Sequence, residues 1–180
     1  MKTCLIISIS LSQLFFSLAS CGKKTATSDD LLKTKKQGYI GNNLKLSGYY
    51  YFKSGDRILN SYVLYYNGVL LNSGAAGDNP NTLLFLENNF ISSAYIQAEK
   101  EHKPSWGVFV VDGNKIIIEH WISGEGPLKS YIKEGSIIND STFKITSASR
   151  QDGSESINLE ELYSFKKFSP KPDSVNKFIK

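Results

Sequence analysis

From residue 44 onward the chain consists of short runs of alternating apolar and polar residues, each ended by a pair of turn-forming residues. Alternation with a period of two is typical of strands that bury one face. The pairs begin at Asn67, Asp112, Asn139 and Asp152, and they supply the Asn, Asp or Gly that a tight turn between antiparallel strands requires. The pattern predicts about eight strands in meander order, over residues 44–53, 58–66, 69–72, 106–111, 115–122, 128–138, 141–149 and 159–168.

A meander of this length tends to close into a barrel, because closure removes the two exposed edges of the sheet. Ten Tyr and ten Phe residues also favour strands. The turn pairs start at unequal intervals, which argues against a propeller or a solenoid. We therefore expect a single all-β domain over residues 44–168, folded as an antiparallel meander barrel of about eight strands.

One segment, residues 81–103, lacks both the alternation and the turn pairs. Pro104 follows it and marks an end. We expect a helical insertion here, either one helix or two short helices broken near Ser92-Ser93, lying against the mouth or flank of the barrel. A long lid loop is the alternative. The apolar residues at helical spacing are Leu83, Leu86, Phe90 and Ala94.

The first twenty residues have the composition of a secretory signal peptide. Lys2 gives a positive start, and the apolar stretch from Leu5 to Leu18 is shorter than a membrane-spanning helix needs. The stretch ends in Leu18-Ala19-Ser20-Cys21. This motif resembles the lipobox of bacterial lipoprotein precursors, which implies cleavage before Cys21 and lipidation of that cysteine. The alternative is an ordinary signal peptide followed by an incidental thiol.

The two flanks of the predicted barrel are polar. Residues 21–43 are rich in lysine, and we expect them to form a lipidated tether that holds the domain away from a membrane. Residues 169–180 begin with Ser169-Pro170, which cannot continue a strand, so we expect a surface tail. The formal net charge of +4 is too small to indicate a nucleic-acid partner.

The chain offers no recognisable catalytic or metal-binding set. His102 and His120 are its two histidines, and neither accompanies a nucleophile motif. Two histidines without a cysteine pair do not make a zinc site, and the acidic turns lack the ligand spacing of a calcium loop. We therefore expect a protein that is not an enzyme and that uses no metal and no cofactor.

His120 is the residue most open to a role in binding. It shares a strand face with Ile118, whereas Glu119 and Trp121 point to the opposite face. A histidine among apolar residues is usually a core or rim residue, but it could instead hold the head group of a ligand in the barrel lumen. The possible ligand-binding residues are His120, Ile118 and Trp106.

Eight strands enclose an interior just wide enough for side chains or for one small ligand. Large inward residues could therefore fill the lumen and leave no room for a ligand. The candidates for such filling are Phe143, Phe165 and Trp106.

Several hairpin segments are similar to uncharacterised lipocalin-like lipoproteins of Bacteroidetes. These segments are residues 48–52, 65–68, 106–109, 113–116, 135–143 and 163–170. The likeness covers most of residues 44–172, and it implies a lipocalin-like fold and a place in the cell envelope. It implies no catalytic residue, because none is assigned in that family.

We therefore expect a lipid-anchored protein of the cell envelope, at the outer membrane, on either its periplasmic or its surface face. Its expected function is to bind a small apolar or amphiphilic ligand, with the membrane as partner through acyl chains on Cys21. The alternative is a structural or assembly subunit that docks onto another envelope protein through exposed aromatic residues. Those residues would come from Tyr49, Tyr50, Tyr51, Phe52, Tyr62, Tyr65 and Tyr66.

Overall fold

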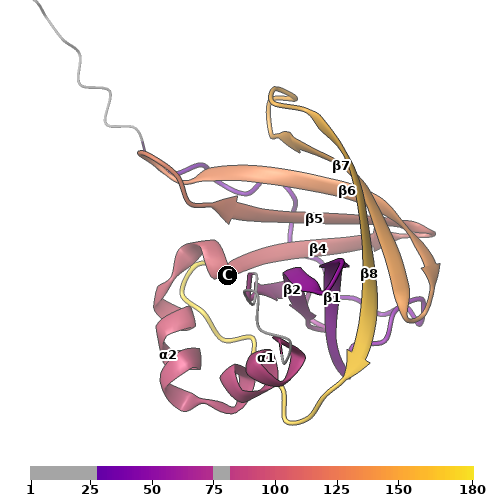
Figure 1. The fold of residues 1–180 in the computed structure, drawn as a ribbon. Helices are drawn as coiled ribbons and strands as arrows, with labels where there is room; N and C mark the ends of the chain where they lie inside the picture. Colours follow the sequence, from indigo (N-terminus) through magenta and orange to yellow (C-terminus); the bar gives the residue numbers. More distant parts are fainter. Residues whose placement is uncertain (1–27, 75–81) are drawn as a thin grey trace, which may run out of the picture.

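The computed structural model describes residues 28–74 and 82–180, in which eight antiparallel strands close into a barrel (Figure 1). Each strand pairs with the next one along the chain, and β8 returns to pair with β1 between Gly48↔Lys167 and Phe52↔Tyr163. The expected all-β meander barrel is confirmed. The strands are β1 Gly48–Ser54, β2 Arg57–Leu64, β3 Val69–Asn72, β4 Trp106–Asp112, β5 Lys115–Ile122, β6 Lys129–Asn139, β7 Thr142–Arg150 and β8 Ile157–Lys167.

The lumen of the barrel is filled with aromatic and aliphatic side chains over much of its length. The ring of Tyr163 stacks on Phe143 with centroids 4.8 Å apart and on Tyr62 with centroids 5.2 Å apart. All three side chains are buried. The stack therefore leaves no continuous channel along the barrel. Phe143 fills the lumen, as expected in the alternative in which large inward residues leave no room for a ligand. The buried inner cluster comprises Tyr39, Leu44, Leu46, Tyr50, Tyr62, Leu64, Leu70, Phe109, Ile116, Ile118, Ile137, Phe143, Ile145 and Tyr163.

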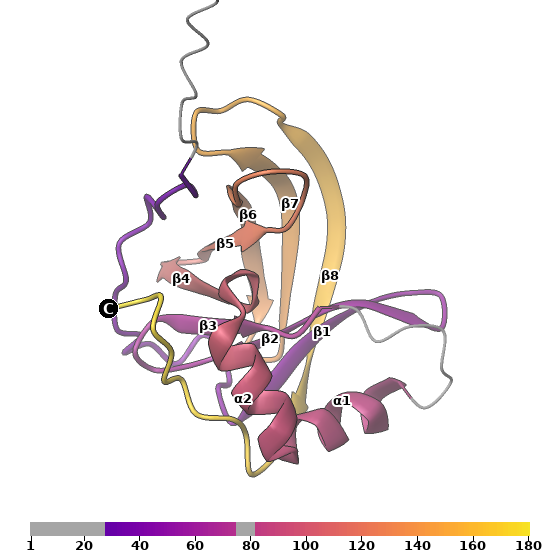
Figure 2. The same ribbon diagram turned by 90° about the vertical axis from the view of Figure 1, so that its left-hand side faces the viewer.

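The predicted helical insertion consists of two short helices, α1 Thr82–Ile91 and α2 Ser93–Glu101, followed by a 3₁₀ turn η1 Lys103–Ser105. Ser92 separates the helices and caps α2, because its hydroxyl accepts a hydrogen bond from the backbone NH of Tyr95 at 3.3 Å. The helices lie on one flank of the barrel together with the C-terminal tail (Figure 2). The form with two helices is confirmed, and the lid loop is not observed.

The helices cover a second apolar cluster on the outer face of β1–β4. Trp106 belongs to this outer cluster, where it is fully buried and donates a hydrogen bond from Nε1 to the backbone oxygen of Glu99 at 2.7 Å. The expectation that Trp106 points into the lumen is therefore wrong. Both faces of β4 are covered, so apolar residues on it do not reveal which face is inner. The outer cluster comprises Tyr49, Ile58, Val63, Tyr65, Val69, Leu71, Leu86, Phe90 and Trp106.

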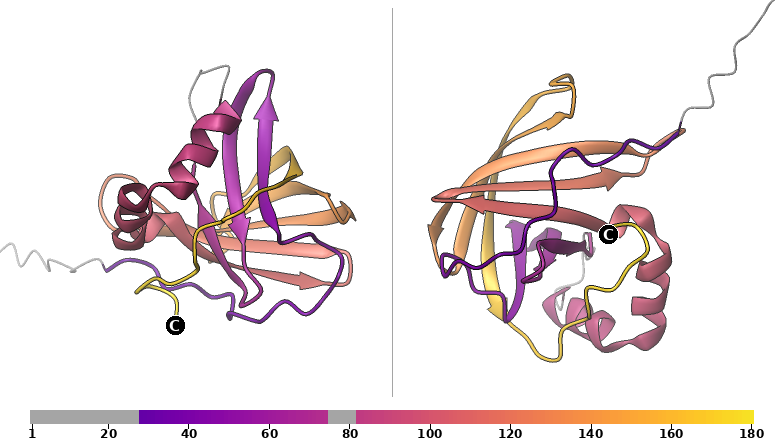
Figure 3. Two further views of the ribbon diagram at one scale, coloured as in Figure 1. Left: turned by 90° about the horizontal axis from the view of Figure 1, so that it is seen from below. Right: turned by 180° about the vertical axis from the view of Figure 1, so that it is seen from behind.

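Residues 28–47 form a strap that crosses the outer surface of the barrel and then covers one of its ends (Figure 3). Glu119, buried on the outer face of β5, accepts hydrogen bonds from the backbone NH groups of Lys33 at 3.0 Å and Thr34 at 2.6 Å. The expectation of a tether that holds the domain away from a membrane over residues 21–43 is wrong for residues 28–43, which are bound to the barrel. A buried carboxylate needs donors, and the strap supplies them.

The strap is also held by the turn between β2 and β3. Gly68 adopts a φ of 79°, and a Cβ added there would lie 2.1 Å from the backbone oxygen of Gln37. Next to this contact, the backbone NH of Tyr39 donates to the backbone oxygen of Tyr66 at 2.7 Å. Glycine is therefore required at this turn both for its conformation and for the close approach of the strap.

The C-terminal tail, residues 168–180, is irregular and lies on the surface, as expected, but it is fixed there by specific contacts. Lys171 donates from Nζ to the backbone oxygens of Leu46 at 2.7 Å and Leu64 at 3.0 Å. Phe178 and Ile179 pack against the outer cluster. The predicted signal peptide and Cys21 lie outside the described residues.

Candidate binding site at the barrel mouth

The two ends of the barrel differ. At one end the strap closes the lumen, with Leu44 and Leu46 buried in the inner cluster and the backbone NH of Lys45 donating to Asp140 at 2.8 Å. At the other end a cavity of about 520 Å³ opens to solvent. We call it the mouth cavity; β2, β3, β5, β6 and the α2–η1 segment contribute its walls. Its lining includes Leu59, Asn60, Asn72, Pro104, His120, Ile122 and Lys133.

A buried ion pair lies at the floor of the mouth cavity. Lys133 Nζ on β6 lies 2.8 Å from Oε2 and 3.1 Å from Oε1 of Glu161 on β8. The side chains are only 11% and 16% exposed. Burial opposes the charged ammonium, but Tyr62 and Glu161 outweigh it and raise the pKa of Lys133. Lys133 therefore keeps its charge at neutral pH, and its direct contact with Glu161 compensates that charge.

Hydrogen bonds extend from this ion pair across the lumen. The Tyr163 hydroxyl donates to Glu161 at 3.0 Å. Asn60 Nδ2 donates to the hydroxyls of Tyr163 at 3.1 Å and Tyr62 at 2.9 Å. Burial is the main cause that raises the pKa of Tyr62 and keeps its hydroxyl protonated. The network satisfies the polar groups that close the inner end of the cavity.

His120 on β5 completes the floor as an uncharged imidazole. Its Nδ1 lies 3.0 Å from the backbone oxygen of Trp121, which can only accept, so Nδ1 carries the proton and Nε2 keeps its lone pair. Burial, aided by Lys133 and opposed by the Trp121 carbonyl, Glu161 and Glu119, lowers the pKa of His120 to about 4. Nε2 lies 3.4 Å from the Tyr62 hydroxyl, at the long limit of a hydrogen bond.

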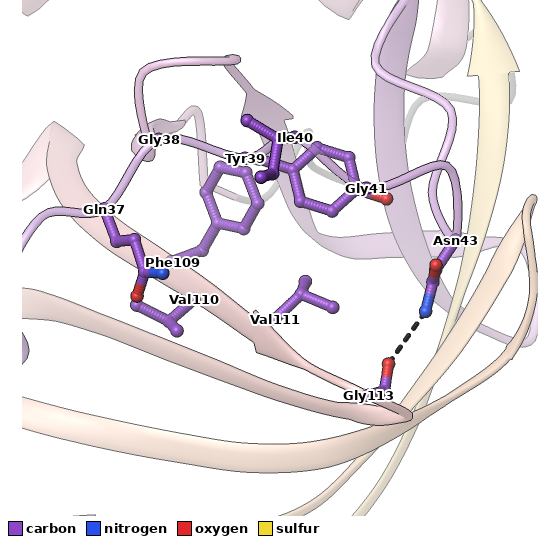
Figure 4. Close-up of a pocket in the computed structure, with 10 residues that line it drawn as sticks. All are labelled: Gln37, Gly38, Tyr39, Ile40, Gly41, Asn43, Phe109, Val110, Val111 and Gly113. Atoms are coloured by element: carbon purple, nitrogen blue, oxygen red, sulfur yellow. Dashed lines mark hydrogen bonds between the residues drawn. The ribbon is translucent and has the colours of Figure 1, made fainter.

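A second, smaller cavity of about 300 Å³ lies between the strap and the C-terminal half of β4 (Figure 4). Tyr39, Phe109 and Val111 contribute apolar surface to it, and Asn43 Nδ2 closes one side by donating to the backbone oxygen of Gly113 at 2.8 Å. Ile40 lines it and is fully exposed. None of the described side chains that line this strap cavity is charged, so it offers less chemistry than the mouth cavity.

The structure does not bring the three predicted binding residues together. His120 lines the mouth cavity, Ile118 is buried deeper in the inner cluster, and Trp106 lies in the outer cluster. Sequence reasoning missed Lys133 and Glu161. One signal was available for Lys133, because counting back from Ile137 in steps of two places it on the inner face of β6.

The described residues contain no group of three or more His, Cys, Asp or Glu side chains that could hold a metal ion. No helix in residues 28–74 or 82–180 is both long and apolar enough to cross a membrane. Comparison with known proteins gives no family: no family model matches the chain, and no curated protein or solved structure is significantly similar to it. The candidate function therefore depends on the chemistry of the mouth cavity.

Proposed function

We propose that this protein is a non-enzymatic binding module, anchored by lipid in the cell envelope, whose mouth cavity takes a small amphiphilic ligand. The observation that carries the proposal is the contrast within one cavity. Its floor is a compensated polar network that includes Lys133 and His120, whereas Leu59, Pro104 and Ile122 provide apolar surface near the rim. Its volume of about 520 Å³ falls within the usual range of small-molecule sites.

The filled lumen limits how such a ligand can sit. The stacked rings of Tyr62, Phe143 and Tyr163 occupy the space below the floor, so a long apolar chain has no room along the barrel axis. A ligand would place its polar end on the floor and its short apolar part against the rim. This arrangement favours an amphiphilic ligand over a purely apolar one.

Native mass spectrometry tests the proposal on the chain from Gly22 to Lys180, secreted without lipid and purified from the envelope of its own host. This chain includes every described residue. We expect a bound small molecule as added mass that extracts into organic solvent. Two substitutions of exposed aliphatic residues form a matched pair: Leu59→Asp places a charge in the mouth cavity, and Ile40→Asp places one in the strap cavity.

The added mass should be lost in Leu59→Asp and kept in Ile40→Asp. Loss in Ile40→Asp alone would move the ligand to the strap cavity. A bare mass in every sample would favour the alternative, a subunit that docks onto another envelope protein. Of the seven aromatic residues proposed for that docking, Tyr66 stands out as exposed, at 69%, while Tyr49, Tyr50, Tyr62 and Tyr65 are buried.

The anchor is a separate part of the proposal and has its own test. Two or three acyl chains on Cys21 would hold the protein on a membrane far more firmly than one, at roughly 0.8 kcal/mol for each buried methylene. The Cys21→Ser variant of the full chain should therefore appear in the soluble fraction of the envelope. A Cys21→Ser protein that still sediments with membranes would refute the lipid anchor and leave the binding site untouched.

A further inference from the structure

The charges on the floor of the mouth cavity cancel. Lys133 and Glu161 contact each other directly. His120 is uncharged at neutral pH, because its Nδ1–H donates a hydrogen bond to the Trp121 carbonyl and burial holds its pKa well below neutral. An anionic head group would compete with Glu161 for Lys133, and a cationic one would compete with Lys133 for Glu161. Either would also lose its own hydration above a floor whose two charges already pair with each other. Glu99, which also lines the cavity, further disfavours an anion.

Two polar groups in the lining have hydrogen-bonding capacity left among the described residues. Asn72 Oδ1 accepts from the backbone NH of Gly74 at 3.1 Å, which fixes the orientation of the amide. Asn72 Nδ2 then lies 3.5 Å from His120 Nδ1, but that nitrogen carries a proton and cannot accept. On the same imidazole, Nε2 is an acceptor with a single long contact to Tyr62. The cavity thus offers an amide donor and an imidazole acceptor close together.

A hydroxyl group both donates and accepts a hydrogen bond, so it matches this pair. From the charge balance and the unused donor and acceptor, we infer that the mouth cavity is specific for an uncharged head group bearing hydroxyls, such as the glycerol or sugar end of a single-chain amphiphile. This inference rests on the proposed function and narrows its ligand class. Burying unsatisfied groups is costly, which makes such a site selective.

Three amphiphiles with the same eight-carbon chain test the inference: monooctanoylglycerol, octanoate and octyltrimethylammonium. Isothermal titration calorimetry on residues 22–180 at neutral pH, below the micelle concentration of each probe, gives their dissociation constants. We expect monooctanoylglycerol to bind at least about tenfold more tightly than either charged probe, which is about 1.4 kcal/mol. Leu59→Asp should abolish this binding and Ile40→Asp should keep it.

Variants of His120 and of Tyr66 test the acceptor. His120→Phe keeps an aromatic ring but removes Nε2, and it should weaken monooctanoylglycerol at least about tenfold. Tyr66→Phe is the control, because Tyr66 is exposed and does not line the mouth cavity. That variant should bind within about threefold of the unchanged protein. Asn72→Ala, at a partly exposed position, replaces His120→Phe as the test if near-ultraviolet circular dichroism shows that the latter does not fold.

The outcomes distinguish a failure of the head-group inference from a failure of the proposed binding function. If octanoate or octyltrimethylammonium binds as tightly as monooctanoylglycerol, the head-group inference is wrong while the binding module stands. If none of the three probes binds at 1 mM, the proposed function itself fails. If binding survives Leu59→Asp and is lost in Ile40→Asp, the mouth cavity is not the site, and the inference falls with it.

Discussion

Replacing Glu161 by Gln should strongly destabilise the barrel, because it leaves the ammonium of Lys133 uncompensated inside the lumen. The pair is 11% and 16% exposed, and breaking a buried pair by removing one partner costs about 3–5 kcal/mol. Lys133 borders a cavity that water can enter, so we expect the lower end, about 3 kcal/mol. With a slope of about 2 kcal/mol per molar, the urea midpoint should fall by about 1.5 M.

Two further variants complete this experiment. Lys115 and Glu134 form an ion pair with a similar N–O distance, 3.0 Å, but their side chains are 50% and 45% exposed. Glu134→Gln should therefore cost at most about 1 kcal/mol. The double variant Lys133→Met, Glu161→Leu removes both buried charges and should recover most of the loss. If Glu161→Gln loses no more stability than Glu134→Gln, solvent reaches the pair and the description of a desolvated floor is refuted.

Three other perturbations test separate parts of the structure. Burial lowers the pKa of His120 from 6.5 to about 4, so this residue binds a proton more readily in the unfolded chain than in the folded one. The contribution of the neutral imidazole to the free energy of unfolding is complete above pH 6.5 and falls by about 3 kcal/mol as the pH drops to 4. Urea titrations of the unchanged protein and of His120→Phe, repeated between pH 6.5 and 4, give the pH dependence of the free energy of unfolding. The same pH dependence in both proteins would contradict the assignment. Phe143→Ala should cost about 3–5 kcal/mol, against about 0.5 kcal/mol or less for the half-exposed Phe85→Ala, and a similarly small loss for Phe143 would place it on the surface. Gly135→Ala sets a Cβ 1.9 Å from the backbone oxygen of Lys144, where β6 and β7 pair with a bulge, and should lower the melting temperature, whereas Gly124→Ala meets nothing within 4 Å and should not.

The sequence predicted the meander because its hairpins are short. Gly113-Asn114 forms the turn between β4 and β5, with Gly113 at a φ of 56°. A turn this short leaves little freedom in how the two strands align. Lys115–Ile122 therefore begins and ends where alternation predicts, with Ile118 and His120 on the inner face.

Longer-range features could not be read in the same way. Lys133 pairs with Ile118 across β5 and β6, but six residues, 123–128, separate these strands and leave their register open. Glu161 lies on β8, and its contact with Lys133 depends on the relative positions of three strands. The strap was misread because its contact with the barrel is made by backbone NH groups, which donate to Glu119, 86 positions from Lys33 along the chain.

Closure of the barrel by β1 and β8 has a consequence for how the chain acquires its fold during synthesis. Gly48 pairs with Lys167, and Phe168, Phe178 and Ile179 complete the outer cluster. A growing chain therefore exposes one edge of β1 until β8 has been made, so the barrel cannot close stepwise as its strands emerge. Chains that end before β8 should form open sheets with unpaired edges, which tend to aggregate. The host would need to shield or degrade them, which makes β8 as important for safe production as for stability.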